Sequence, residues 1–347
     1  MGIELTLMHT QKDKTATDVK RERAKDICAV ICTHDHPDLL RRALTSLMNQ
    51  TVIPDDILVV DNAPSGPAVK TVVQNEFPDV RYVEEPIAGL DFARNRALSE
   101  TSKEVIAFMD DDVVAGISWI SAIQSVFLES KQIAICTGKV SAYSVATAGA
   151  QLFEANGGFA RGNTRIHLPE DRKRPIHGLQ PPLIAWSISI GSGCSFAVRR
   201  ETIIKLGGFD EALDMGAALA GGGDLDMLWR AIDSGYEVIY EPSVEARHEH
   251  RSDYNDSVHQ IIEHNRSLIA MLTKVIVYGC HTGRAGVVAF LIWRLMKPGI
   301  RLIRRFAGQD PLPAKVLLRL WWNCWRGLIA YVFARRLAKK RRIVSYV

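Results

Sequence analysis

The sequence predicts an α/β protein with a mostly parallel sheet, helices on both faces of that sheet, and a helical C-terminal region. Three observations predict this class. Continuous apolar segments alternate with helical segments in the first half, acidic residues follow several of those apolar segments, and the pattern after about residue 256 becomes helical and basic. Continuous apolar strands are typical of parallel sheets that are buried on both faces. With 347 residues, one large domain plus an appendage is expected.

The first half contains the strands and helices on which this prediction depends. Strands are expected at 26–33, 56–61, 80–85 and 104–112, with an amphipathic helix at 37–49 and another helix at 89–100. In parallel sheets of this kind, ligands bind beyond the carboxyl ends of the strands. Asp35, Asp61 and the triplet Asp110 to Asp112 are all expected at such ends. The sequence therefore predicts a binding site at that edge.

The second half is less regular. Residues 140–190 have many turn-forming residues and few periodic apolar positions, which is typical of functional loops. A helix that stops at Gly207 and Gly208 is expected within 199–213, and residues 221–242 predict a glycine-rich loop, a helix and a strand. Two basic helices should follow. We expect Pro298 and Gly299 to break the first of them, and the second to begin after Pro313.

The N-terminus and the cysteines favour a reducing, cytoplasmic location. Residues 1–26 are polar and lack the apolar stretch of a secretory signal, so we expect a loosely attached tail. The six cysteines form no CxxC pair and no zinc-type spacing. Cys28 and Cys32 fall in an apolar strand, where free cysteine behaves as a small hydrophobic residue.

Charge divides the chain unequally. Residues 264–347 contain 17 Lys and Arg and a single acid, Asp310, which gives a net charge of +16 against −12 for the other residues. Four of the seven tryptophans also lie in this region, where no apolar run reaches the roughly 20 residues that a membrane span needs. Basic, Trp-rich amphipathic helices favour the interface of an anionic membrane, on its cytoplasmic face here. A helical subdomain packed on the core is the alternative, and no nucleic-acid-binding motif is recognisable.

The acidic triplet Asp110-Asp111-Asp112 follows an apolar strand. Three adjacent carboxylates repel one another unless a cation neutralises them. Mg²⁺ or Mn²⁺ accepts carboxylate and phosphate oxygens together and can bridge a protein to a diphosphate. The alternative interpretation is an acidic loop or a helix cap.

Further candidate residues lie in three other segments. Asp224 follows three glycines at the start of a helix, where it is either a general base or an N-cap. His248 and His250 follow a strand; a neutral imidazole binds metal ions, although a structural role is the default for His250. Asp61 is placed to contact a base or ribose, or else shapes a turn. Arg94 is placed to reach a phosphate, or else is solvated.

Seven segments together resemble the family 2 glycosyltransferases, which have the GT-A fold. In chain order they are CTHDHPDLLRRALTSLMNQT, VVDNAPSG, EEPIAGLDFARNRAL, FMDDDV, GSGCSFAVRRETIIKLGGFDE, GGGDLDMLWRAIDSGYEVIYEP and RHEH. Each segment is weak evidence alone, but seven in the family's order are specific. The resemblance covers about residues 27–255. It implies a glycosyltransferase domain at 27–255, between the polar tail expected at 1–26 and the basic, Trp-rich helical region expected at 256–347.

The resemblance implies a role for each matching residue. Asp112 would be the direct metal ligand, with His248 completing the metal and diphosphate site. Asp224 would be the catalytic base, although the family's Glu-Asp pair reads Gly223-Asp224 here and leaves Asp226 as a second candidate. The donor-binding residues would be Thr33, Asp35, Asp61, Arg94, Asp110 and Asp111. The acceptor side would contain Gly191 to Ser195, including Gly193 and Cys194, together with Gly207 to Asp210 and Asp226.

The implied reaction is an inverting, metal-assisted transfer of a sugar from a nucleotide diphosphate to an acceptor hydroxyl of a lipid-linked sugar or a nascent glycan. Two other functions are open. A sugar-phosphate nucleotidyltransferase would need a basic, glycine-rich loop after the first strand, and THDHPDLL is not one. A non-catalytic binder of nucleotide sugars would be expected to lack the base, and Asp224 is present.

Overall fold

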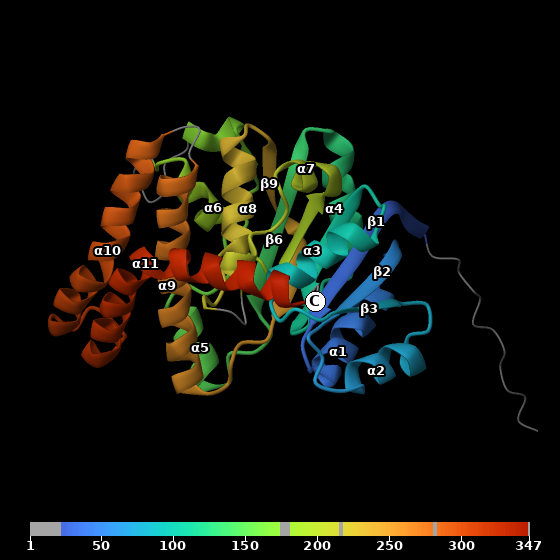
Figure 1. Ribbon diagram of the computed structural model, residues 1–347, viewed down its shortest axis with the longest axis horizontal. Coiled ribbons are helices and arrows are strands. Elements are labelled where there is room, and N and C mark those ends of the chain that lie inside the picture. The colour runs from blue at the N-terminus through green and yellow to red at the C-terminus, as the bar shows by residue number, and fades with distance from the viewer. Residues whose placement is uncertain (1–21, 174–180, 215–217, 280–282, 346–347) are drawn as a thin grey trace, which may run out of the picture.

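The computed structural model describes residues 22–173, 181–214, 218–279 and 283–345. Its centre is a nine-stranded sheet with the order β3-β2-β1-β4-β8-β6-β9-β5, in which β7 pairs with β9 (Figure 1). The strands are β1 (Glu22–Thr33), β2 (Val52–Asn62), β3 (Arg81–Glu85), β4 (Val105–Asp110), β5 (Val113–Ala115), β6 (Ile133–Ala142), β7 (Ile166–Leu168), β8 (Ser195–Arg199) and β9 (Glu237–His248). The strand β1 begins at Glu22, within the segment expected to be a tail.

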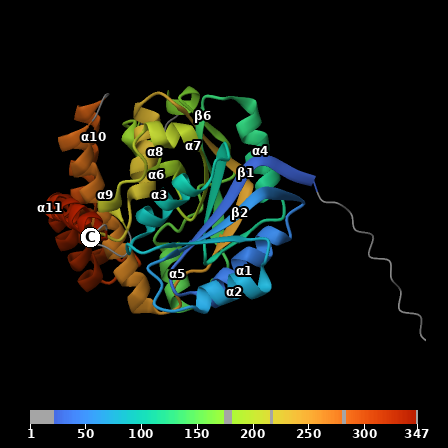
Figure 2. The same cartoon turned by 45° about the vertical axis from the view of Figure 1, so that its right-hand side comes forward.

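Helices cover both faces of the sheet and form the C-terminal region (Figure 2). They are α1 (Pro37–Met48), α2 (Ala68–Glu76), α3 (Leu90–Glu100), α4 (Trp119–Glu129), α5 (Ala148–Ala155), α6 (Ile184–Ile190), α7 (Arg200–Lys205), α8 (Gly223–Asp233), α9 (Tyr254–Tyr278), α10 (Arg284–Phe306) and α11 (Ala314–Ser345). Two short 3-10 helices, η1 (Glu170–Lys173) and η2 (Glu211–Leu213), complete the set. Residues 140–190, expected to be irregular, contain α5, β7, η1 and α6, while 174–180 lie outside the described residues.

The predicted fold class is confirmed. The sheet contains both parallel and antiparallel strands. The strands β3, β2, β1 and β4 run parallel, whereas β8 runs antiparallel to both β4 and β6. Because parallel strands end at one edge, β1, β2 and β4 bring their last residues together: Thr33 pairs with Asp61, and Cys32 pairs with Asp110. The acidic residues expected at strand ends therefore share one edge of the sheet.

Strand β1 shows why its sequence is continuously apolar. Ala29 and Ile31 pack with α1, α2 and α4 on one face of the sheet. Cys28, Val30 and Cys32 pack with α3, α6, α7 and α8 on the other face. Alternate residues thus enter two different cores, and each core requires apolar side chains. The five described cysteines are buried and free.

Helix α10 is continuous through Pro298 and Gly299, so the expected break is wrong. A proline inside a helix removes one backbone hydrogen bond, but packing can compensate for that loss. Pro298 is buried, and a Cβ atom on Gly299 would lie 3.1 Å from Trp321 of α11. The Pro-Gly pair therefore serves close packing between α10 and α11.

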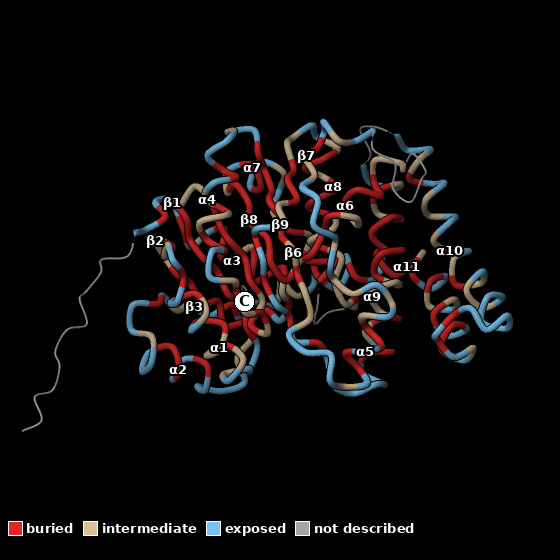
Figure 3. Tube along the Cα trace, turned by 180° about the vertical axis from the view of Figure 1, so that it is seen from behind, coloured by how far each residue is buried: buried red, intermediate tan, exposed pale blue. Residues whose placement is uncertain are grey.

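The helices α9, α10 and α11 share an apolar core with Trp229 of α8. The far end of α11 also reaches the α/β domain: Tyr331 donates to Asp210 at 2.8 Å, and Arg342 pairs with Glu211. The outer faces of α10 and α11 are largely exposed (Figure 3). In the part of the chain that is described, no helix is long and apolar enough to cross a bilayer.

Gly327 in α11 provides a test of the packing between α9 and α11. Alanine normally stabilises a helix by about 1 kcal/mol relative to glycine. At this position, however, its Cβ would lie 2.7 Å from the Arg266 carbonyl oxygen and 2.7 Å from Ile269 Cβ. We expect Gly327→Ala to lower the free energy of unfolding by about 1–3 kcal/mol in urea titrations. Gly66→Ala, with nothing within 4 Å, is the control, and a stabilised Gly327→Ala variant would contradict the packing.

Candidate active site

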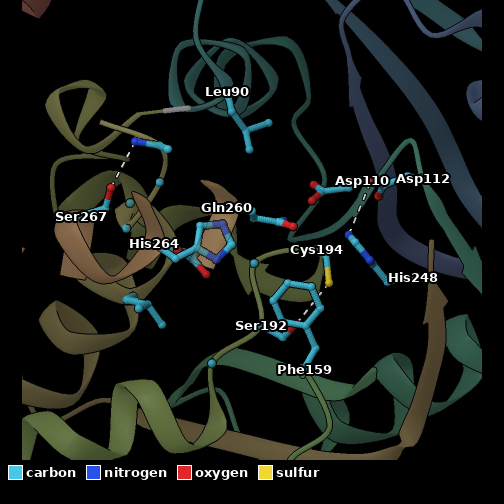
Figure 4. Close-up of a pocket in the computed structure, with 18 of the residues that line it drawn as sticks. Leu90, Asp110, Asp112, Phe159, Ser192, Cys194, His248, Gln260, His264 and Ser267 are labelled. Carbon is cyan, nitrogen blue, oxygen red and sulfur yellow. Dashed lines mark hydrogen bonds and ion pairs between the residues drawn. The ribbon is translucent and has the colours of Figure 1, made fainter. Parts of the chain in front are cut away.

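A cavity of about 500 Å³ lies at the edge of the sheet where the parallel strands end. Its walls come from the end of β4, the loop before β8, the glycine loop before α8, the end of β9, and α9. Figure 4 shows Asp110, Asp112 and His248 on one side of this cavity, with His264 and Ser267 across from them. Segments far apart in the sequence therefore meet at one place.

The three carboxylates after β4 point in different directions. Asp110 and Asp112 line the cavity. Asp111 faces away and accepts hydrogen bonds from Thr33 at 2.6 Å and from His36 at 3.2 Å. Burial raises the pKa of Asp110 and of Asp112, and the neighbouring carboxylates raise both further. A positive charge in the cavity would favour the ionised form of both groups.

His248 lies beside Asp112 because β5 and β9 pair there. Val113 is in register with His248, the Glu249 N–H donates to the Asp112 carbonyl oxygen, and His248 Nε2 lies 3.4 Å from Asp112 Oδ2. Burial lowers the pKa of His248 to about 3, and the neighbouring His250, His264 and Arg251 contribute. The imidazole is therefore neutral at physiological pH.

Asp112 and His248 fit the requirements of a divalent cation. Asp112 Oδ1 is buried and has no hydrogen-bond partner among the described residues. A neutral imidazole and a carboxylate oxygen are both good ligands for Mn²⁺. The carboxylate oxygen is also a good ligand for Mg²⁺. Nowhere in the described ranges do three or more His, Cys, Asp or Glu side chains form a metal-binding group. Two protein ligands leave further coordination positions for oxygens of a bound molecule.

Asp224 reaches the cavity from the first turn of α8. Gly221 and Gly222 before it adopt φ values of 123° and 108°, which glycine tolerates and other residues rarely adopt. Ser267 of α9 holds this loop by accepting from the Ala220 N–H at 3.1 Å. The Asp224 carboxylate packs against Gly193, where an added Cβ would lie 2.5 Å from Asp224 Oδ2. Gly193 and Cys194 line the same part of the cavity.

The structure separates Asp224 from Asp226. Asp226 is 1% exposed, does not line the cavity, and accepts from Arg230 at 2.8 Å and from Lys274 at 2.6 Å. Lys274 also pairs with Asp210 at 2.6 Å. Asp210 and Asp226, expected on the acceptor side, are therefore not brought to the cavity; they connect the α/β domain to α9.

Arg94 is buried and forms part of the cavity wall. Its guanidinium donates to the Gly193 carbonyl oxygen at 2.8 Å and to Asp91 at 3.1 Å, and it lies 3.7 Å from Asp110. Arg94 therefore fixes the loop at Gly193 and places a positive charge next to Asp110.

Thr33, Asp35 and Asp61 lie at the adjoining edge of the sheet, outside the lining of the cavity. Asp61 is buried, accepts from the Tyr82 hydroxyl at 2.7 Å, and keeps Oδ1 without a partner among the described residues. Burial raises the pKa of Asp61. Asp35 accepts from the Ser65 N–H at 3.0 Å, and this hydrogen bonding lowers its pKa.

Sequence reasoning did not identify the α9 wall of the cavity. Gln260, His264 and Ser267 all line it. Their spacing of four and three residues places them on one helical face, so this polar stripe on an apolar helix was a usable signal. Phe159 and Arg161 also line the cavity, from the loop between α5 and β7. Arg161 Nε is buried with no partner in the described part of the chain.

Comparisons with known proteins agree with this architecture. Residues 28–207 match the family described as Glycosyl transferase family 2. A pre-mycofactocin glycosyltransferase of Mycobacterium tuberculosis is 26% identical over 234 residues, covering 67% of this chain and 44% of the relative. N-acetylgalactosaminyltransferase 6 of Drosophila melanogaster is 28% identical over 237 residues, covering 65% of this chain and 34% of the relative. This chain therefore spans less than half the length of either relative.

Among solved structures, the mannosyltransferase PcManGT from Pyrobaculum calidifontis, in complex with GDP-Man and Mn²⁺, superimposes with a TM-score of 0.53. The match covers 93% of this chain and 90% of the other at 18% identity. At that identity the likeness shows a shared fold.

Two further carboxyl groups are buried at this end of the molecule: Asp91, which lines the cavity, and Asp214, which is hydrogen-bonded to the Asp91 backbone. The Asp91 N–H donates to Asp214 Oδ1 at 2.8 Å, while Asp91 Oδ2 and Asp214 Oδ2 have no partner among the described residues. Burial raises the pKa of both groups; Asp91 raises that of Asp214 further, and Asp224 and Asp210 raise that of Asp91 further. Asp214 is fully buried, so the protein favours its protonated form.

Asp214→Asn is expected to make the protein more stable at high pH. A carboxyl group whose pKa is raised by folding contributes stability below the ordinary carboxyl range and loses it as the pH rises towards its folded pKa. Asparagine keeps an oxygen for the Asp91 N–H and cannot ionise. The stability gain in urea unfolding should therefore grow from pH 5 to pH 8, by up to about 1.4 kcal/mol for each pH unit. If the difference in unfolding free energy between Asp214→Asn and the wild type did not change with pH, the raised pKa of Asp214 would be wrong.

Proposed function

The chain belongs to glycosyl transferase family 2, and we propose that it transfers a sugar from a nucleotide diphosphate donor to an acceptor hydroxyl, with inversion at the anomeric carbon. One observation carries this proposal. Asp110, Asp112, Asp224 and His248, from three separate segments, line a single cavity. A nucleotidyltransferase or a non-catalytic binder would not require a carboxylate at the position of Asp224.

Asp112 and His248 would hold the divalent cation, Mg²⁺ or Mn²⁺. When bound, the cation neutralises the charge that develops on the departing diphosphate. The unpartnered Asp112 Oδ1 and the neutral His248 support this assignment. The fold neighbour with GDP-Man and Mn²⁺ supports both the type of donor and the use of a cation.

Residues at the same edge of the sheet would make the remaining contacts to the donor. Asp110, next to Arg94, would orient the ribose and diphosphate. Thr33 and Asp111, which are hydrogen-bonded to each other, and Asp35 and Asp61 would form the nucleoside side. The unpartnered Asp61 Oδ1 is a suitable acceptor for an N–H of the base or a hydroxyl of the ribose.

Asp224 would act as the general base. As the acceptor oxygen bonds to the anomeric carbon, the bond from that carbon to the diphosphate oxygen breaks, and the diphosphate leaves with the electron pair. Asp224 takes the proton of the acceptor hydroxyl. Gly193 and Cys194, which lie against Asp224, would form the acceptor wall. The acceptor is a lipid-linked sugar or a nascent glycan.

The outer faces of α10 and α11 would bind an anionic membrane on its cytoplasmic side. Large apolar side chains there are exposed, including Ile300, Ile303 and Phe306 in α10 and Trp322, Ile329 and Phe333 in α11. Arginines and lysines lie among them, and 264–347 has a net charge of +16. Apolar and basic side chains on one pair of helices match the lipid tails and the anionic headgroups of such a membrane.

The function is tested by measuring the thermal stability of the full chain with a panel of nucleotide sugars, with and without Mn²⁺. A donor that binds the folded state raises Tm. We expect one class of nucleotide sugar to raise Tm in the presence of Mn²⁺ and to be hydrolysed slowly, with both effects abolished by EDTA. If no nucleotide sugar raised Tm with Mn²⁺, the proposed function would be wrong.

Asp224→Asn should separate donor binding from transfer. Because the amide cannot accept the acceptor proton, we expect the transfer rate to fall by about 10²–10⁴-fold while the Tm shift with donor and Mn²⁺ is retained. Asp226→Asn, which weakens the contacts to Arg230 and Lys274, should lower Tm and retain most of the transfer activity. Equal loss of donor binding and transfer in Asp224→Asn would indicate a structural role instead.

Membrane binding is tested by sedimentation with vesicles of phosphatidylcholine alone or mixed with phosphatidylserine. We expect binding to the mixed vesicles, weakening with salt. Phe306→Glu combined with Trp322→Glu should weaken binding at least tenfold, because two apolar side chains no longer enter the interface. Leu128→Glu is the matched control, since Leu128 is 79% exposed on α4, away from α10 and α11. If the wild type, the double variant and Leu128→Glu bound the mixed vesicles equally, the outer faces of α10 and α11 would not be the membrane-binding surface.

A further inference from the structure

A chain of hydrogen bonds leads from His248 away from the cavity. His248 Nδ1 lies 3.0 Å from His250 Nδ1, and His250 Nε2 lies 2.7 Å from Glu154 Oε1. His248 is the last residue of β9 and His250 follows two residues later, whereas Glu154 is on α5, about a hundred residues earlier in the chain. Both imidazoles are buried.

The contact between the two Nδ1 atoms restricts where the ring protons can be. A neutral imidazole has one N–H and one acceptor nitrogen. With Glu154 Oε1 as the acceptor, His250 Nε2 carries the proton of the neutral ring and His250 Nδ1 accepts. His248 Nδ1 is then the donor at the 3.0 Å contact. The remaining nitrogen, His248 Nε2, has a free lone pair and faces Asp112 at 3.4 Å.

We propose that Glu154 and His250 are positioning residues that hold His248 in the tautomer whose Nε2 lone pair is directed at the cation site. This inference rests on the proposed function. Two acceptors facing each other inside a protein are unfavourable unless a positive charge lies between them. The hydrogen-bond chain therefore prepares the site for a cation before the cation binds, as partners of metal-bound histidines do generally.

Aromatic packing keeps the rings in this arrangement. The ring of Phe159 lies 5.0 Å from that of His248 and 5.9 Å from that of His250, and the ring of Phe153 lies 4.7 Å from that of His250. Rotation of either imidazole would require these rings to move. Phe159 also lines the cavity, so the same side chain covers the hydrogen-bond chain and faces the substrate space.

The same pairing of groups occurs elsewhere without a link to the cavity. His167 Nε2 lies 3.2 Å from Glu237 Oε2, on β7 and β9. Neither residue lines the cavity. Glu237→Gln is therefore a matched control for Glu154→Gln, because each replaces the carboxylate partner of a histidine by a neutral amide of the same shape.

The first test measures the tautomers directly, by ¹⁵N NMR of the histidines in the metal-free full chain. In the wild type, we expect the proton of His248 on Nδ1 and that of His250 on Nε2. The amide of Glu154→Gln can donate to His250 Nε2 as well as accept from it, so the His248 proton should no longer be confined to Nδ1, whereas Glu237→Gln should leave both rings unchanged. A wild-type His248 with its proton on Nε2 would overturn the proposal without recourse to any variant.

The second test measures the Mn²⁺ concentration that gives half of the maximal Tm rise in the presence of GDP or UDP. Glu154→Gln should raise it about 10–100-fold, and Glu237→Gln should not change it. If the wild type responds to Mn²⁺ and Glu154→Gln responds equally, the positioning role is wrong while the proposed function stands. If the wild type does not respond to Mn²⁺ with either nucleotide, the proposed metal site itself fails.

Discussion

The structure depends on the cost of placing several carboxylates next to one another away from water. Asp110 and Asp112 lie at the end of β4, Asp224 lies in the first turn of α8 and Asp91 in that of α3, and all four line one cavity. Arg94 offsets part of this negative charge through Asp91 and Asp110. Burial, together with the remaining negative charge, raises the pKa of Asp110 and of Asp112 in the absence of a cation. A fold that retains this repulsion gains a strong preference for a positively charged ligand at that position.

The sequence predicted the elements that are determined by neighbouring residues or by a periodic pattern of apolar residues. The continuous apolar run of β1 indicated a strand buried on both faces, and the acids at the end of β4 indicated the edge where the cavity lies. Contacts between distant segments could not be predicted. The helix break at Pro298 was wrong because packing against Trp321 decides that region, and the roles of Asp210 and Asp226 depend on Lys274 of α9. Glu154 gave no signal, because its partner is nearly a hundred residues away.

Helix α9 connects the two parts of the chain. One side of α9 lines the cavity with Gln260, His264 and Ser267, and its other side packs against α10 and α11. Lys274, also on α9, holds Asp210 and Asp226 away from the cavity. The boundary expected near residue 256 therefore falls at the beginning of a helix that completes the site. Removing the helices beyond it would remove one wall of the cavity.

The central claim is that Asp112 and His248 hold one divalent cation. It is tested most directly by anomalous diffraction at the manganese edge, from crystals of the full chain grown with Mn²⁺ and GDP or UDP. We predict a single strong peak at about 2.1 Å from both an Asp112 carboxylate oxygen and His248 Nε2. A peak bound to other side chains, or a nucleotide bound in the cavity with no peak between these two residues, would contradict the account.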